Sequence, residues 1–283
     1  MPIKPFAALA CPLDMQPLVL VGKSYQCANH HNFDVAKQGD VNLLPVQFKQ
    51  SKNPGDDAAM VHARQSFLAT GLYDCILQKL CAVVQTYISK SPHSHINIID
   101  AGCGEGYYTA GLAKSLSHKS FSMLGFDISK DAIKAAVKTS KDILWAVATN
   151  KKIPVQTASA DVVLSLFGFP VYAEFRRVLK PNGLLIMADP AQNHLIELRQ
   201  ALYAQIKQKN VGTKQTQMLE HFNLVAEHKV QAVQVGPNQA QTKNLLSMTP
   251  HAHKAPKDRL QATIANPPST LTIDVLVQVY KAI

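Results

Sequence analysis

A glycine-rich segment at residues 100–106 constrains the fold of this 283-residue chain more than any other feature. It reads Asp-Ala-Gly-Cys-Gly-Glu-Gly, with an apolar run at residues 96–99 before it and the start of a helix at residues 107–113 after it. Alternating glycines let a backbone turn sharply and bring bare N–H groups against a ligand. The segment therefore predicts a strand, a tight turn and a helix, with a nucleotide-like ligand on the turn.

The spacing of the glycines separates two classes of ligand. Dinucleotide folds use G-x-G-x-x-G, with a pyrophosphate at the helix N-terminus, whereas here the spacing is G-x-G-x-G and Tyr107 takes the place of the third glycine. Glu105 inside the turn would repel a pyrophosphate and would suit an ammonium group. The turn, with Gly102 and Gly104 against the ligand, therefore favours S-adenosylmethionine, whose amino acid end is zwitterionic and whose centre is a sulfonium cation. The alternative is a turn that binds nothing.

A second acidic residue ends the next apolar run. Residues 121–126 are apolar enough for a buried strand, and Asp127 follows them. It lies about twenty residues past the turn, where such folds place a carboxylate on the ribose hydroxyls. Residues 129–138 predict the next helix. An Asp after a strand is commonly only a helix cap or turn residue, and this alternative stands beside the ribose contact.

The rest of the chain alternates strand and helix. Upstream of the turn, the pattern predicts two helices, over residues 58–69 with Asp56 as its cap and over residues 73–89. Downstream, short apolar runs are typical of buried parallel strands, and they lie at residues 143–148, 162–167 and 184–188, the last preceded by a turn at 180–183. Residues 271–280 predict a late antiparallel strand at the end of the sheet, and the Asn-Pro-Pro at 266–268 a loop. The sequence thus predicts an α/β fold with a largely parallel sheet, and the glycine turn predicts S-adenosylmethionine as its ligand.

The chain divides into three parts. Residues 1–40 form a small module with a hairpin turn at 22–23, residues 41–95 a connector with helices, and residues 96–283 the α/β domain that carries the glycine turn. Five scattered cysteines fit a reducing cytoplasm better than a disulfide framework. The apolar patch at residues 6–10 is too short for a membrane span or a signal peptide. We therefore expect a cytoplasmic protein without a membrane partner.

The balance of charge is basic. Lys and Arg together number 29 against 19 Asp and Glu, a formal net charge of +10. Such a surplus indicates either an anionic partner, with nucleic acid the natural candidate, or simply a soluble basic surface. Composition alone leaves both interpretations open.

Five segments in order give the chain a resemblance to the bacterial 23S rRNA (guanine-N1)-methyltransferase family. They are SYQC at 24–27, HNFDVAK at 31–37, VNLLPV at 41–46, PGD at 54–56 and DAGCGEGYY at 100–108. The resemblance implies an N-terminal zinc-ribbon-like module that recognises RNA, over residues 1–40, and a class I, Rossmann-like methyltransferase domain dependent on S-adenosylmethionine, over residues 96–283. It also implies a homodimer with a cleft for 23S rRNA and methylation of a guanine in an rRNA hairpin.

The resemblance also implies particular cofactor contacts. Carried to matching positions, they fall on Tyr73, Gly104, Glu105 and His194. Without the resemblance, His194 would be interpreted as a surface histidine and Tyr73 as a core aromatic residue.

The metal ligands of the family resemble C-x-x-C followed by C-x-x-x-H. The matching residues are Cys11, Asp14, Cys27 and His31, so Asp14 stands where a thiolate is expected. Zinc accepts a carboxylate oxygen, and these residues therefore predict a four-coordinate site, with His30 as an alternative to His31. The other alternative is a module that holds no metal.

The substrate atom sets the chemistry. Guanine N1 carries a proton at neutral pH, so methyl transfer requires its removal and a dry pocket that orients the base. Phe167 or Phe169 is a candidate to stack on a flipped-out guanine, although either is equally interpreted as core, and Asp189 is the candidate general base. Two other functions stay open, a small-molecule methyltransferase and a non-catalytic rRNA-binding protein.

Overall fold

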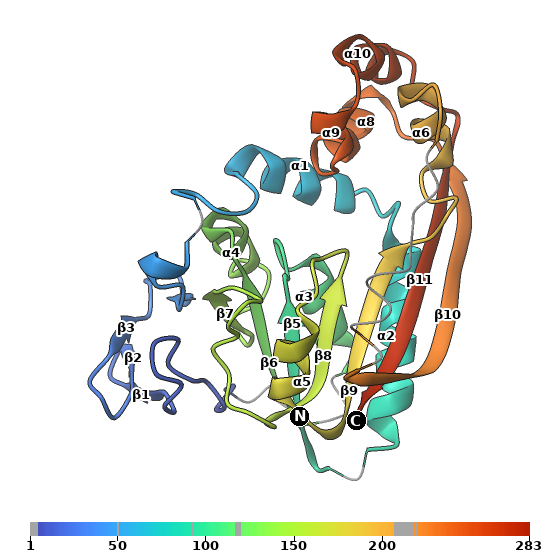
Figure 1. The fold of residues 1–283 in the computed structure, drawn as a ribbon. Helices are drawn as coiled ribbons and strands as arrows, with labels where there is room; N and C mark the ends of the chain where they lie inside the picture. Colours follow the sequence, from blue (N-terminus) through green and yellow to red (C-terminus); the bar gives the residue numbers. More distant parts are fainter. Residues whose placement is uncertain (1–4, 50, 92, 117–119, 207–217, 219) are drawn as a thin grey trace.

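The computed structural model describes residues 5–49, 51–91, 93–116, 120–206, 218 and 220–283. Its centre is an eight-stranded sheet (Figure 1). In spatial order the strands are β10 (Phe222–Val235), β11 (Thr270–Ala282), β9 (Leu179–Pro190), β8 (Ala160–Leu166), β5 (His95–Ala101), β6 (Ser120–Asp127), β7 (Leu144–Val147) and β4 (Val41–Asn42).

The middle of this sheet is parallel, as the sequence predicts. Every neighbouring pair from β9 to β4 runs parallel, and β11 pairs antiparallel with both β9 and β10. All seven residues of β8 are buried, which explains its near-continuous apolar sequence, since a central parallel strand is covered on both faces. The predicted strands at 96–99, 121–126, 143–148, 162–167, 184–188 and 271–280 are confirmed.

Three features of the sheet differ from the sequence prediction. The outermost strand is β10, so β11 is antiparallel as predicted but does not end the sheet. The strand β9 begins at Leu179, so residues 180–183 belong to it, with a bend at Asn182 where φ is 63°. The two-residue strand β4 adds to the other edge. The sequence does not predict β10, because its apolar residues do not alternate with polar ones. Leu224, Val233 and Val235 are exposed, so apolar side chains occupy both faces of the strand.

The helices follow the prediction with small differences at their ends. The first four are α1 (Ala58–Leu68), α2 (Asp74–Ser89), α3 (Tyr107–Ser115) and α4 (Lys130–Ala136). The cap of α1 is Asp57, whose Oδ1 accepts the Met60 N–H at 2.9 Å, and not Asp56. Asp56 is instead ion-paired with Arg64.

Most of the remaining helices lie at one end of the sheet. The remaining helices are α5 (Tyr172–Val178), α6 (Ile196–Leu202), α8 (Gln239–Ser247), α9 (His251–Lys254) and α10 (Lys257–Ala265), with a short 3-10 helix, η1 (Val46–Phe48). Figure 1 shows α1, α6, α8, α9 and α10 together above the end of the sheet at which the parallel strands finish. Ligands of open α/β sheets bind outside the carboxyl ends of the strands, so these helices border the expected site.

A second, three-stranded sheet lies beside the β4 edge of the main sheet (Figure 1). It consists of β1 (Val19–Val21), β2 (Ser24–Gln26) and β3 (Asn32–Asp34). Val21 pairs with Ser24, which confirms the predicted hairpin turn at 22–23. The N-terminal segment packs against the main sheet, because Leu9, Leu18 and Cys27 share one buried cluster with Ile99 and Phe126. Among the described residues, no helix is both long and apolar enough to cross a bilayer.

Candidate active site and metal centre

The glycine turn joins β5 to α3 in the predicted conformation. Gly102 and Gly106 have φ of +87° and +86°, the left-handed region that favours glycine. A Cβ on Gly106 would lie 2.8 Å from the Trp145 ring, whereas a Cβ on Gly102 would meet no heavy atom within 4 Å. Packing therefore requires Gly106, while Gly102 borders open space in which a ligand can lie.

The N–H groups of the turn are used differently from the prediction. The Gly102 N–H donates to the Phe126 carbonyl at 2.9 Å, and the Gly104 N–H donates to Asp127 Oδ2 at 3.0 Å. The expectation that these N–H groups face the ligand is therefore wrong, because β6 already accepts them. Because the glycines have no side chain, a ligand can approach their backbone closely.

Asp127 braces the turn from the end of β6. Its second oxygen, Oδ1, accepts the Ser129 N–H at 2.8 Å, and burial raises the pKa of its carboxyl group. Asp127 is thus a turn residue, which is the alternative to a ribose contact that the sequence leaves open. A carboxylate oxygen accepts more than one hydrogen bond, so a ribose contact at Asp127 stays a prediction.

Two buried carboxyl groups flank the turn. Asp100 accepts the Thr109 hydroxyl on Oδ2 at 2.5 Å, and among the described residues its Oδ1 has no hydrogen-bond partner. Burial raises the pKa of Asp100 to about 7. Burial also raises the pKa of Glu105, against the opposing charge of Arg64, whose Nη1 lies 3.8 Å from Glu105 Oε2. Since burial penalises negative charge, a cationic group of a ligand would be favoured here.

Arg64 is a site residue that the sequence analysis missed. It lies on α1, its Nη2 is 2.5 Å from Asp56 Oδ2, and its Nη1 would be 3.6 Å from a Cβ on Gly104. No short motif marks such a residue, because it reaches the turn only through the packing of α1 over the sheet.

Four aromatic side chains meet beside the turn, and we call them the aromatic group: Tyr73, Tyr108, Phe167 and His194. Tyr73 Oη lies 3.0 Å from His194 Nε2, and both side chains are buried. The Phe167 ring centroid lies 6.5 Å from that of His194 and 6.0 Å from that of Tyr108. The structure therefore brings together Tyr73 and His194, which are 121 residues apart in sequence.

Phe167 holds an unusual backbone conformation. Its φ is 55°, in the left-handed region, and its N–H donates to the Ala188 carbonyl at 2.8 Å. Strained non-glycine residues cluster at functional sites, where surrounding structure maintains them. The hydrogen bond to Ala188 of β9 maintains the conformation of Phe167, whose ring lies in the aromatic group.

Two other predicted residues lie elsewhere. Phe169 is 84% exposed, and its carbonyl accepts the Asn150 side-chain amide at 3.0 Å. Asp189 lies on β9 near Tyr280, where burial first and then Tyr172 and Asp189 raise the pKa of Tyr280 to about 12. Tyr280 belongs to a different buried cluster from Tyr73. The aromatic group contains neither Phe169 nor Asp189.

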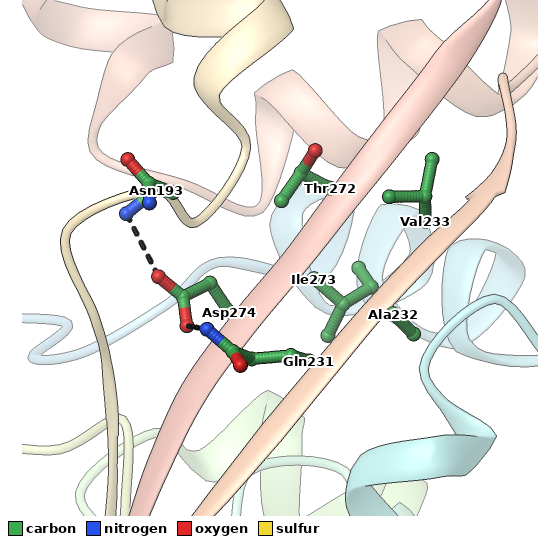
Figure 2. Close-up of a pocket in the computed structure, with 7 residues that line it drawn as sticks. All are labelled: Asn193, Gln231, Ala232, Val233, Thr272, Ile273 and Asp274. Carbon is green, nitrogen blue, oxygen red and sulfur yellow. Dashed lines mark hydrogen bonds between the residues drawn. The ribbon is translucent and has the colours of Figure 1, made fainter.

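The loop that carries His194 is fastened to β11 by Asp274. The Asp274 carboxylate accepts the Asn193 N–H at 2.9 Å and the Gln231 side-chain amide at 3.4 Å, as Figure 2 shows. The Asp274 main chain accepts the Ala191 N–H at 2.8 Å and donates its own N–H to His194 Nδ1 at 3.2 Å. Asn193, Gln231 and Asp274 border a pocket of about 290 Å³ between the loop, β10 and β11.

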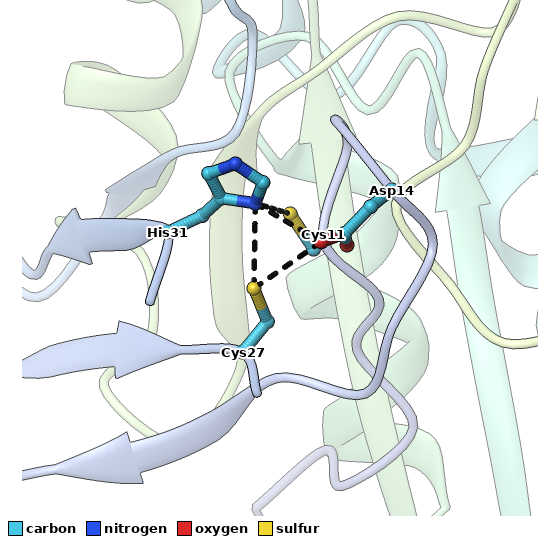
Figure 3. Close-up of side chains that lie close together, drawn as sticks. All are labelled: Cys11, Asp14, Cys27 and His31. Carbon is cyan, nitrogen blue, oxygen red and sulfur yellow. Dashed lines mark hydrogen bonds and ion pairs between the residues drawn. The ribbon is translucent and has the colours of Figure 1, made fainter. Parts of the chain in front are cut away.

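The predicted metal ligands form one cluster in the N-terminal module. Figure 3 shows the side chains of Cys11, Asp14, Cys27 and His31 pointing toward one another. His31 Nδ1 lies 3.4 Å from both sulfur atoms and 3.1 Å from Asp14 Oδ2, and all four ligand atoms lie within 4.8 Å of one another. Tetrahedral zinc with these ligand types spaces them about 3.3 to 3.8 Å apart, so the four residues fit the ion.

The structure also separates the two histidine candidates. His31 contributes Nδ1 to the cluster, whereas His30 lies in the preceding turn with φ of 62° and its side chain is exposed. The Cys27 N–H donates to the His31 carbonyl at 3.2 Å, which holds the two ligands of this half together. Of the two alternatives in the sequence, the geometry selects His31.

The fold and the glycine turn between β5 and α3 define a class I methyltransferase dependent on S-adenosylmethionine. A family model of a methyltransferase domain matches residues 92–249, and a model of the RlmA N-terminal zinc ribbon matches residues 9–52. The match to the methyltransferase domain includes the glycine turn, and the match to the zinc ribbon includes all four residues of the metal cluster.

Curated relatives narrow the class. A Bacillus subtilis protein named as a 23S rRNA (guanine-N1)-methyltransferase is 35% identical over 278 residues, covering 95% of each chain. The 23S rRNA (guanine(748)-N1)-methyltransferase of Streptomyces fradiae is 30% identical over 224 residues, covering 78% of each chain. The chain belongs to the family of 23S rRNA (guanine-N1)-methyltransferases.

Proposed function

We propose that the protein transfers a methyl group from S-adenosylmethionine to N1 of a guanine in 23S rRNA. The observation that carries the proposal is the open space at Gly102 between two buried carboxyl groups, in a chain that aligns along its length with relatives of that name. The space suits a ligand with a cationic amino acid end, and the relatives' names supply the substrate.

The proposed cofactor contacts follow the turn and its neighbours. They are Tyr73, Gly102, Gly104, Glu105, Asp127 and His194, with the addition of Asp100, whose Oδ1 has no partner in the described part of the chain. When bound, S-adenosylmethionine supplies the methyl group from its sulfonium centre. The carboxyl groups of Asp100 and Glu105 would neutralise the ammonium group, and the absence of a Cβ at Gly102 admits the ligand to the backbone.

We propose that the aromatic group receives the guanine. A base inside an RNA helix is out of reach and must be flipped into a pocket, where aromatic rings stack on it. Phe167, held in its left-handed conformation between Tyr108 and His194, is the stacking residue of this proposal. Phe169, two residues further and exposed, would contact RNA outside the pocket.

We propose zinc at Cys11, Asp14, Cys27 and His31, supported by their spacing. The zinc-bound module, as the resemblance implies, would contact RNA. Lys152 fastens the module to the methyltransferase domain, because its Nζ donates to the Leu13 carbonyl at 3.3 Å and lies 5.2 Å from the centre of the Phe48 ring. We further propose a homodimer, which the resemblance implies, and a place in the cytoplasm, which the scattered cysteines favour.

Primer extension on 23S rRNA tests the methylation directly. N1 methylation blocks the Watson–Crick edge, so reverse transcription should stop one base before the modified guanine in cells that carry the gene. Cells without the gene, or with the Gly102→Val variant, should lack the stop. A stop that is absent from all strains would remove the rRNA substrate and favour a small-molecule methyltransferase.

A further inference from the structure

The carboxylate of Asp14 accepts hydrogen bonds on both of its oxygens. Its Oδ1 accepts the Gln16 N–H at 3.0 Å, and its Oδ2 accepts the side-chain amide of Asn29 at 2.9 Å. The same Oδ2 lies 3.1 Å from His31 Nδ1, so this oxygen is the one that faces the other ligand atoms. Oδ1 is engaged by the main chain instead.

We propose that Asn29 is a positioning residue of the metal site, whose amide holds Asp14 so that this carboxylate binds the ion through one oxygen, Oδ2. A carboxylate can bind a metal ion through one oxygen or through both. A structural zinc site is tetrahedral and takes one atom from each of four side chains. The inference rests on the proposed zinc site, and it goes beyond that site because Asn29 is not one of the four ligands.

A tight turn fixes the main chain on which Asp14 lies. The Cys11 N–H donates to the Gln16 carbonyl at 2.8 Å, and the Met15 N–H donates to the Cys11 carbonyl at 2.8 Å. These bonds hold the Cα of Asp14, but its carboxyl group can still rotate about the side-chain bonds. The hydrogen bonds from Gln16 and Asn29 restrict that rotation.

Asn29 reaches Asp14 from the loop that carries the other two ligands. The Cys27 N–H donates to the His31 carbonyl at 3.2 Å, which closes the loop at residues 27–31. Asn29 lies within this loop, 15 residues from Asp14 in sequence. Its amide thus ties the two pairs of ligands to each other across the cluster.

The need for Asn29 follows from the aspartate itself. Where the family pattern has Cys, a thiolate offers a single sulfur atom, whereas the carboxylate of Asp14 offers two oxygens that must be told apart. Hydrogen bonds to a metal-binding carboxylate fix its orientation, and their loss typically costs about tenfold to a hundredfold in metal affinity. Asn29 is exposed, so we expect the lower end of this range.

The affinity of the full-length protein for zinc, measured in competition with a chelator, tests the inference. Asn29→Ala should weaken zinc binding by about tenfold. The matched control is Asn32→Ala, which removes another exposed amide of the module, whose Nδ2 donates to Asp34 Oδ1 at 3.1 Å outside the cluster. The control should change the affinity by less than about twofold. Equal effects of the two variants, or no effect of either, would overturn the inference.

The Asp14→Cys background separates a role through Asp14 from a role in the loop at residues 27–31. The carboxylate is absent in this background, so Asn29→Ala should cost less than about threefold in zinc affinity. A loss as large as in the wild-type background would show that Asn29 acts by shaping its own loop, and would contradict positioning.

Cobalt(II) in place of zinc gives a readout independent of affinity. Four-coordinate cobalt(II) absorbs visible light strongly, and further ligand atoms weaken its bands. The wild-type protein should show the strong bands, and Asn29→Ala should weaken them at saturating cobalt(II), because the second carboxylate oxygen or a water joins the ion. Identical spectra would overturn the inference. A wild-type protein that binds neither zinc nor cobalt(II) would instead contradict the zinc site itself, and methyl transfer enters none of these measurements.

Discussion

The glycine turn and the cluster of Cys11, Asp14, Cys27 and His31 hold their ligands by opposite means. The turn is a backbone feature between β5 and α3, with Ile98, Ile99 and Trp145 of the sheet fully buried around it. The cluster consists of four side chains on loops beside a small sheet, whose strand β1 exposes all three of its residues, Val19–Val21. The comparison suggests that the turn keeps its shape without a ligand, whereas the module depends on its ion.

The largest expected effect comes from removing one metal ligand. Cys27→Ser should abolish zinc binding and unfold the module around β1 to β3, because binding free energies of structural zinc are on the order of 10 kcal/mol and small modules have little other core. Affinity for S-adenosylhomocysteine should stay within about threefold, since Cys103 of the turn and Tyr73 of the aromatic group pack in a different buried cluster from Cys27. Metal analysis, hydrogen exchange over residues 9–42 and calorimetry measure the three quantities.

The matched control is Cys75→Ser, which alters a free, half-buried cysteine outside the cluster. It should leave the zinc content and the exchange pattern unchanged. A Cys27→Ser protein that loses S-adenosylhomocysteine binding would show that the two regions are one cooperative unit and would break the comparison.

The next effect concerns the charge buried at the turn. The pKa of Asp100 is raised to about 7, so the folded protein holds this proton over a pH range in which the unfolded chain, at its ordinary value of 3.8, has released it. Stability is therefore lost as pH rises from about 4 to about 7. Asp100→Asn should remove this loss and raise the free energy of unfolding by about 4 kcal/mol above pH 7, with little change at pH 4.

Denaturant unfolding of both proteins from pH 4 to pH 8 measures this difference. The variant should also bind S-adenosylhomocysteine more weakly, because it lacks the negative charge opposite the ammonium group. A free-energy difference that is constant with pH would show that Asp100 is ionised in the folded protein throughout.

Two glycines of the turn sharpen the contrast between packing and binding. Gly102→Ala and Gly106→Ala both place a Cβ at a left-handed φ, which costs roughly 1 to 2 kcal/mol. Gly106→Ala adds overpacking against Trp145, for a total loss of about 3 kcal/mol in the free energy of unfolding. Gly102→Ala should destabilise less and weaken S-adenosylhomocysteine more. Equal losses of stability would contradict the open space at Gly102.

The smallest effect tests the substitution in the metal cluster. Asp14→Cys restores the ligand type that the family pattern predicts, and zinc favours thiolate over carboxylate in closed structural sites. We expect affinity for zinc to rise by about tenfold, or about 1.4 kcal/mol, in competition with a chelator. Asp14→Ala should lower it. An unchanged affinity in both variants would mean that Asp14 does not bind the ion.

The sequence predicts local features of both regions and misses the long-range ones. The glycine turn and the buried parallel strands follow from residue type and periodicity, because their conformations are set locally and by burial on both faces. The sequence does not reveal Arg64 or Asp274, which reach the site from α1 and from β11. Their positions depend on the packing of the whole chain.

The same limit explains the errors in the strands and in the turn. Some exposed side chains of β10 are apolar, so its sequence does not alternate between apolar and polar residues. The strand β4 has only two residues, too few for a pattern. The N–H groups of Gly102 and Gly104 turn toward β6, because β6 supplies acceptors that the sequence of the turn does not show. Residue patterns thus locate the site, and the partners of each polar group come from the tertiary structure.

Methylation of purified 23S rRNA by the purified protein is the most direct test of the central proposal. After reaction with S-adenosylmethionine, the rRNA is digested to nucleosides and analysed by mass spectrometry. The wild-type protein should produce N1-methylguanosine, and the Gly102→Val variant should produce none. A wild-type protein that binds S-adenosylhomocysteine but leaves guanine N1 in 23S rRNA unmethylated would contradict the proposal.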